Sequence, residues 1–122
     1  MRHLILIALL ATPVHAGERD AFLGTWGTEA QCAGEPLKPG GTVLAAPYEI
    51  DRLWLKHGQL WCALRWGPVE ATETGNFTVA TAQCGEDAVR SYFLGMRRSG
   101  EEMTLRWDVF NQVGPLKRCP PS

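Results

Sequence analysis

The feature that most constrains this chain is a pair of glycine-containing turns, each flanked by stretches in which apolar and polar residues alternate. The turns are His57-Gly58 and Ser99-Gly100. Glycine supplies the positive φ that tight hairpins need, and alternation is typical of strands with one buried face. The chain is therefore predicted to be all-β, with a short helical turn at 86–90. The expected strands lie near 22–29, 48–56, 59–66, 76–83, 90–98, 102–110 and 114–119.

The first hairpin is expected to have one apolar and one mixed face. With His57-Gly58 as its central pair, Trp54 lies opposite Trp61 and Leu55 lies opposite Leu60. The apolar face is predicted to be core, and it collects Leu53, Leu55, Leu60, Cys62, Leu64 and Trp66. The other face collects Arg52, Trp54, Lys56, Gln59, Trp61, Ala63 and Arg65.

The second hairpin gives the same separation of faces. With Ser99-Gly100 as its central pair, Leu94 lies opposite Leu105, and Arg97 on the outer face lies opposite Glu102. Two hairpins that each have one apolar face imply a sheet that closes or folds on itself. A small antiparallel barrel of about six to eight strands is the first expectation, and a two-sheet sandwich is the second.

Four cysteines, Cys32, Cys62, Cys84 and Cys119, predict two disulfides, because an even number of cysteines in a small exported domain is typical of a disulfide framework. Their spacing contains no C-x-x-C pair, which argues against a zinc site. Three pairings are possible. Joining Cys62 to Cys84 across a hairpin centred on Glu73 would send Phe77 and Val79 to the polar face. The favoured pairs are therefore Cys32–Cys62 and Cys84–Cys119.

The first sixteen residues have the pattern of a secretory signal peptide: a basic start at Arg2, an apolar stretch, and a small residue at Ala16. Cleavage after Ala16 is expected to leave residues 17–122 as a single disulfide-linked β domain, either periplasmic or secreted. No other segment is apolar enough for a membrane span. With Arg2 removed, acidic side chains slightly outnumber basic ones, so nucleic acid is not an expected partner.

The sequence offers little that suggests catalysis. His57 is the one histidine left after cleavage, and it is expected at an exposed hairpin tip. Glu49 and Asp51 share a strand face, but nothing in the chain resembles a calcium loop or the carboxylate pair of a glycosidase. No catalytic residues, metal site or cofactor are therefore predicted.

The mixed face of the first hairpin is the candidate binding site. Two tryptophans among three cations form an aromatic and basic platform of the kind that dominates protein interfaces. Its residues are Arg52, Trp54, Lys56, Trp61 and Arg65. The alternative is that the loop 34–47, or another strand, covers this face and that both indoles belong to ordinary packing.

Gly24-Thr25-Trp26 at the entry to the first strand resembles the G-x-W motif of the calycins, the lipocalins and their relatives. In size, signal peptide and motif the chain is closest to small bacterial periplasmic inhibitors of secreted metalloproteases. That family carries one disulfide, and its inhibitory N-terminal segment has no counterpart here. The resemblance implies that Trp26 plugs one end of a barrel, with Gly24 allowing the turn into the strand. It also implies a basic residue packed across Trp26: Arg118, with Lys117 and Arg106 as alternatives.

These observations predict an exported, non-catalytic binding protein whose partner is another exported protein, with inhibition of a secreted hydrolase as the leading role. A carrier of a small apolar ligand is the first alternative, and it requires a hollow barrel. An envelope structural or accessory protein is the second alternative. An enzyme using His57 or the Glu49/Asp51 pair is the least favoured interpretation. No oligomeric state is predicted.

Overall fold

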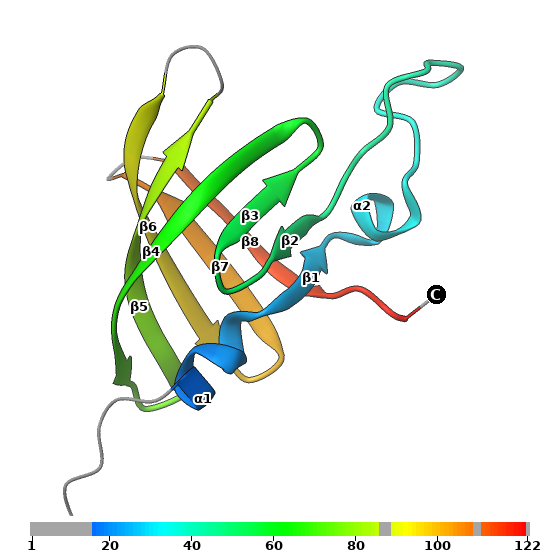
Figure 1. Ribbon diagram of the computed structural model, residues 1–122. Helices are drawn as coiled ribbons and strands as arrows, with labels where there is room; N and C mark the ends of the chain where they lie inside the picture. Colours follow the sequence, from blue (N-terminus) through cyan, green and yellow to red (C-terminus); the bar gives the residue numbers. More distant parts are fainter. Residues whose placement is uncertain (1–15, 86–88, 109–110, 122) are drawn as a thin grey trace, which may run out of the picture.

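A computed structural model describes residues 16–85, 89–108 and 111–121 (Figure 1). Over these residues eight antiparallel strands follow one another in chain order and close into a barrel, because β8 pairs with β1. The predicted barrel is confirmed. The strands are β1 (Gly24–Gly27), β2 (Tyr48–Ile50), β3 (Trp54–His57), β4 (Leu60–Ala71), β5 (Gly75–Cys84), β6 (Arg90–Ser99), β7 (Glu102–Trp107) and β8 (Asn111–Arg118).

Among the described residues, three short helical segments accompany the barrel: α1 (Ala16–Arg19), η2 (Asp20–Phe22) and α2 (Glu29–Ala33). The sequence patterns did not predict α2, although its start has a clear local cause. Thr28 caps the helix, since its hydroxyl accepts from the Gln31 N–H while the Gln31 side chain accepts from the Thr28 N–H. The predicted signal peptide, Ala16 apart, lies outside the described residues, as do residues 86–88 of the predicted helical turn.

The stretch expected as one strand over 48–56 is divided by a turn at residues 51–53. The Asp51 N–H donates to the Trp54 carbonyl, and the Asp51 carboxylate accepts from the Arg52 N–H. The turn carries Leu53 out into solvent, with 73% of its surface exposed. Its predicted place on the core face is therefore wrong.

Both hairpin registers differ from the predicted ones by one residue, for the same physical reason. His57 pairs with Leu60 and Ser99 pairs with Glu102, so the central residues are Gly58-Gln59 and Gly100-Glu101. Each glycine occupies the first central position, with a φ of +62° or +60°. A type II′ turn places glycine at this first position, whereas the sequence pattern predicts it at the second.

The shift changes the cross-strand partners but not the faces. Trp54 lies opposite Ala63 and Lys56 lies opposite Trp61, so the predicted pairing of the two tryptophans is wrong. In the second hairpin Arg97 lies opposite Thr104, not Glu102. Moving the turn by one residue moves each cross-strand partner by two residues. Because side chains alternate with a period of two, the new partner lies on the same face as the predicted one. Leu55, Leu94 and Leu105 are accordingly buried, as predicted.

The disulfides join Cys32 to Cys119 and Cys62 to Cys84, so both favoured pairings are wrong. Cys62 and Cys84 face each other directly across β4 and β5. This register puts Phe77 and Val79 on the outer face, the consequence for which it had been rejected. The interior takes the smaller residues of β5 instead: Thr78, Ala80, Ala82 and Cys84 are buried.

Closely packed side chains fill the barrel. An eight-stranded barrel has an interior just wide enough for its own side chains, which explains why β5 contributes small ones. The fully buried larger side chains are Phe22, Trp26, Leu55, Leu94, Met96, Met103, Leu105 and Leu116.

Trp26 closes the end of the barrel beside η2. Its indole N–H donates to the Phe22 carbonyl at 3.1 Å, and the guanidinium carbon of Arg118 lies 4.4 Å from the centre of its ring. Arg118 also donates to the Leu23 carbonyl at 2.8 Å. A side chain at Gly24, where φ is +129°, would overlap the Arg118 guanidinium. Glycine is therefore required at the entry to β1.

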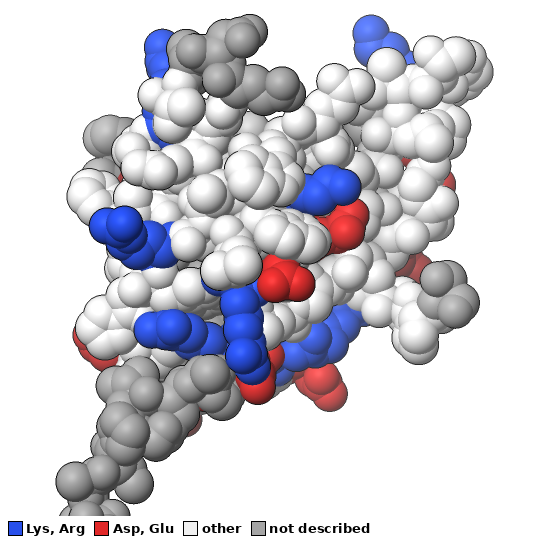
Figure 2. All heavy atoms as spheres, in the orientation of Figure 1, with Lys and Arg blue, Asp and Glu red and all other residues white. Residues whose placement is uncertain are grey.

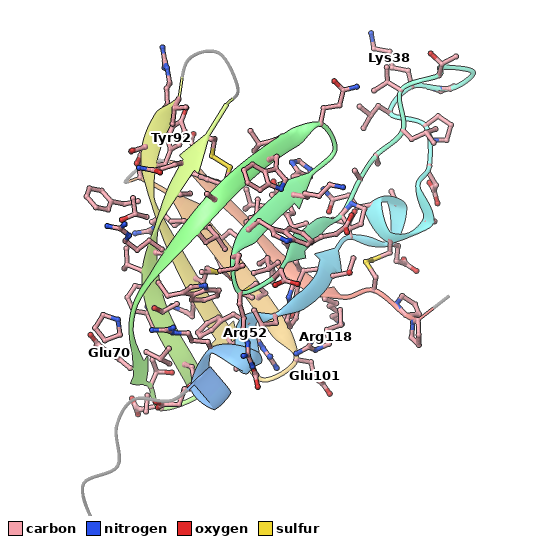
Figure 3. The ribbon with its side chains drawn as sticks, viewed as in Figure 1. Lys38, Arg52, Glu70, Tyr92, Glu101 and Arg118 are labelled. Atoms are coloured by element: carbon pink, nitrogen blue, oxygen red, sulfur yellow. A yellow bond between two sulfur atoms is a disulfide. The ribbon has the colours of Figure 1, made fainter. Side chains whose placement is uncertain are left out.

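A second cation, Arg98 from β6, lies 4.9 Å from the centre of the same indole. Its guanidinium donates to the carbonyls of Ala21 and Gly100, and it thereby ties η2 to the β6–β7 turn. Burial, together with the positive charge of Arg118, lowers the pKa of Arg98 from its ordinary value. Figure 3 shows Arg118 at the same end of the barrel as α1, with Tyr92 at the opposite end.

Replacing Trp26 with alanine is expected to lower the free energy of unfolding by about 3–5 kcal/mol, because it removes a fully buried indole and leaves a cavity. Urea denaturation of the oxidised protein measures this loss. Trp61→Ala is the matched control, since Trp61 is half exposed and its removal should cost far less. Equal losses for the two variants would contradict the role of Trp26 as the plug.

Candidate functional site

The predicted platform lies on the outside of the barrel, over β3 and β4. Trp61 is 50% exposed, Trp54 is half-buried, and Lys56 and Arg65 are exposed on the same face. Lys56 lies directly across from Trp61, and Arg65 lies across from Thr81 of β5. We refer to Trp54, Lys56, Trp61 and Arg65 as the outer wall.

Arg52, the fifth predicted residue, does not lie on the outer wall. It occupies the turn between β2 and β3, near the α1 end of the barrel (Figure 3), where its guanidinium pairs with Asp20 of η2 at 3.0 Å. Its carbonyl accepts from the Trp66 indole at 2.6 Å, and the Trp66 ring in turn contacts Phe22. Arg52 thus holds η2 to the barrel.

The outer wall carries mixed charge. Lys56 has Glu49 of β2 as its other cross-strand neighbour, so this cation lies between a carboxylate and an indole. Figure 2 shows basic and acidic side chains on the same side of the barrel, with uncharged surface between them. The outer wall therefore presents the half-exposed Trp61 as apolar surface, with opposite charges on Lys56 and Glu49 beside it.

The loop 34–47, the alternative cover for the outer wall, projects away from it (Figure 1). Residues 35–45, here called the finger, form a narrow hairpin-like projection. Leu37 N–H donates to the Val43 carbonyl at 2.9 Å, and Ala45 N–H donates to the Glu35 carbonyl at 2.7 Å. Lys38 lies at the tip (Figure 3). More than half of the surface of each of three large side chains is exposed: Leu37, Val43 and Leu44.

The base of the finger is fixed to the barrel from one side. Gly34, with a φ of +67°, ends α2 in the left-handed conformation and turns the chain into the finger. Cys32 in the same helix is bonded to Cys119, whose N–H donates to the Thr25 carbonyl of β1. The exposed aliphatic side chains are thus presented on a support that is covalently linked to the C-terminal strand.

The rim of the barrel at the β3–β4 turn holds His57, which pairs with Leu60. The ring of His57 stacks on Tyr48 with centroids 3.9 Å apart. Burial lowers the pKa of His57, against a weaker opposing effect from a hydrogen bond with the Ala46 backbone, and burial raises the pKa of Tyr48. A recess of about 240 Å³ opens at the same end. Its lining is Leu60, Cys84, Tyr92, Trp107, Asp108 and Asn111.

Glu49 and Asp51 do not act as a pair. Glu49 is exposed beside Lys56, whereas the Asp51 carboxylate is used within its own turn. Over the residues that the structure describes, no group of three or more His, Cys, Asp or Glu side chains converges as metal ligands do. Within 16–85, 89–108 and 111–121, no helix is both long and apolar enough to cross a membrane.

An apolar groove of about 260 Å³, which the sequence patterns do not predict, lies on the outer face of β5, β6 and β7. Phe77, Val79 and Phe93 line it. The disulfide pairing favoured from the sequence rests on Phe77 and Val79 facing the core instead. Along β5 the larger residues alternate with small ones, and periodicity alone assigns the larger set to the interior. The position of Cys84 was the available signal, since a buried Cys84 places Thr78, Ala80 and Ala82 on the same inner face.

Comparison of the chain with protein families, curated proteins and solved structures found no match. These comparisons neither confirm nor refute the resemblance of Gly24-Thr25-Trp26 to the calycin motif. In the structure, Arg118 contacts the Trp26 indole where β1 pairs with β8 to close the barrel.

The environment of His57 predicts a stability that depends on pH. Because its pKa is lowered from 6.5 in the folded state, the unfolded chain takes up this proton first as the pH falls. The free energy of unfolding should therefore decline as the pH falls below about 6.5. Urea denaturation from about pH 7.5 to 5 should show a shallower decline for His57→Phe, which keeps a ring against Tyr48. An unchanged pH dependence in this variant would contradict the assignment.

Proposed function

We propose that this protein is an exported, non-catalytic binding protein that recognises another exported protein through the outer wall. The observation that carries the proposal is Trp61, a half-exposed indole beside Lys56 on a strand surface that the finger leaves open. Exposed tryptophan is costly in water and frequent at binding hot spots. Four cysteines paired in two disulfides are compatible with an exported protein in an oxidising compartment.

The filled interior favours recognition on the outside over carriage of a ligand within. A carrier needs a cavity of several hundred Å³, whereas buried side chains from all around this barrel occupy its centre. The recess at the rim is smaller and opens outward. An enclosed apolar ligand would have to displace core residues such as Leu55 or Met96.

Within protein binding, inhibition of a secreted hydrolase is the narrower proposal, and the finger supports it. A convex projection with three exposed aliphatic side chains is complementary to a concave apolar cleft, such as a substrate-binding cleft. Its internal hydrogen bonds and its disulfide-linked base reduce the ordering cost of binding. Glu35 and Lys38 carry opposite charges, so the finger has no net positive charge that would attract it to an anionic membrane.

The outer wall is tested by capture on immobilised, oxidised protein from periplasm and culture medium. A specific partner should be retained by the wild type and released about tenfold more readily by Trp54→Ala/Trp61→Ala, because truncated hot spots mainly raise the dissociation rate. Leu53→Ala is the matched control, since Leu53 is exposed but lies off the outer wall. Full retention by the double variant would refute recognition through these tryptophans.

The inhibitory role is tested separately, with the hydrolytic activity of the same medium on casein. Wild-type protein should lower that activity, whereas Leu37→Ser/Leu44→Ser should not, because both exposed contacts of the finger lose their apolar surface. Thr42→Ala serves as a control within the finger. Equal inhibition by wild type and double variant would refute the role of the finger, and no inhibition at all would refute the inhibitor proposal.

A further inference from the structure

The centre of the apolar groove is a glycine, Gly95, in the middle of β6. Its cross-strand neighbours are Val79 on β5 and Arg106 on β7. Along its own strand the next outward side chains are Phe93 and Arg97. A missing side chain in the middle of a pleated surface leaves a depression that its neighbours enclose. The complete lining is Phe77, Val79, Phe93, Gly95, Arg97, Thr104, Arg106, Asp108 and Gln112.

The backbone does not require glycine at this position. Gly95 is not among the glycines with positive φ, and β6 pairs with β5 and β7 in continuous register around it. A Cβ would meet its nearest neighbours, the Arg106 Cβ and the Phe77 ring, at 3.7 Å, which is ordinary contact. Glycine inside a strand weakens it, and such positions often mark the close approach of another molecule. The backbone conformation at Gly95 therefore does not account for the open space above it.

The walls of the groove combine exposed apolar surface with positive charge. Phe93 is 67% exposed and Val79 is 40% exposed. The Arg97 guanidinium lies over the Phe77 ring at 5.0 Å, and Arg106 donates to the Gln112 side chain at 3.0 Å. Both cations are thus held beside the depression by side-chain contacts that leave further guanidinium donors for a ligand.

The one carboxylate in the lining is already engaged. Asp108 accepts from the Phe93 N–H at 3.1 Å, and its own N–H donates to the Phe93 carbonyl at 2.7 Å. These bonds direct Asp108 toward the backbone of β6, whereas both arginines adjoin the apolar centre. The groove is therefore complementary to an apolar group flanked by negative charge.

We propose that this groove binds an acidic peptide segment of a partner protein, with one apolar side chain over Gly95 and adjacent carboxylates on Arg97 and Arg106. A volume of about 260 Å³ suits a single aromatic or branched side chain, and it is less than most small-molecule pockets provide. The site lies on β5–β7, whereas the outer wall lies on β3–β4, so the inference does not depend on the proposed function.

The probes are two synthetic peptides, acetyl-Glu-Phe-Glu-amide and acetyl-Lys-Phe-Lys-amide, titrated into the isotopically labelled, oxidised protein and followed by NMR. The acidic peptide should move the amide signals of Phe93, Gly95 and Arg106 in a saturable manner. It should bind about tenfold more tightly than the basic peptide, because each arginine adds a modest exposed ion pair. Added salt should reduce this preference.

Gly95→Leu should abolish the saturable shifts by filling the depression, while Gly95→Ala should bind more weakly yet melt at or above the wild-type temperature. Arg97→Gln/Arg106→Gln should bind both peptides alike. The matched control is Arg90→Gln/Lys117→Gln, which changes the net charge equally at exposed positions outside the groove and should keep the preference. Equal binding of the two peptides by wild type, or undiminished binding by Gly95→Leu, would overturn the proposal.

Discussion

The contact on which the rest of the structure depends is that of Trp26 with Arg98 and Arg118. The indole comes from the first strand, Arg98 from the sixth and Arg118 from the last. Trp26 and Arg118 are also direct partners across the β1–β8 pairing that closes the barrel. The same indole holds η2 through Phe22. Closure, the plug and the N-terminal helical turn therefore meet at a single cluster of side chains.

Closure of an eight-stranded barrel around this plug restricts the space within. The interior accepts alanine, threonine and cysteine from β5, and larger residues of the same strand are left outside. A barrel that is filled in this way has little capacity to enclose a ligand, so the recognition surfaces that we propose are on its exterior. The outer wall, the finger and the groove at Gly95 are three such surfaces, each presented on a different part of the scaffold.

Local patterns predicted the fold well and the pairings poorly. Alternation around Gly58 and Gly100 correctly placed Leu55, Leu94 and Leu105 on inner faces. The observed change of register moves each partner by two residues, which leaves every side chain on its predicted face. Alternation left open which turn position each glycine occupies, and thus whether Trp54 meets Trp61 or Ala63. The same limit applied to Cys62 and Cys84, whose pairing depends on which face of β5 is buried.

The sequence by itself determined an all-β chain with two disulfides, a tryptophan at the entry to its first strand and two hairpins with apolar faces. Only the tertiary structure decided the disulfide partners, the separation of Arg52 from the outer wall, and the outward positions of Phe77 and Val79. The reason is physical: alternation fixes which residues share a face, while curvature and closure of the sheet decide which face has room to be the core.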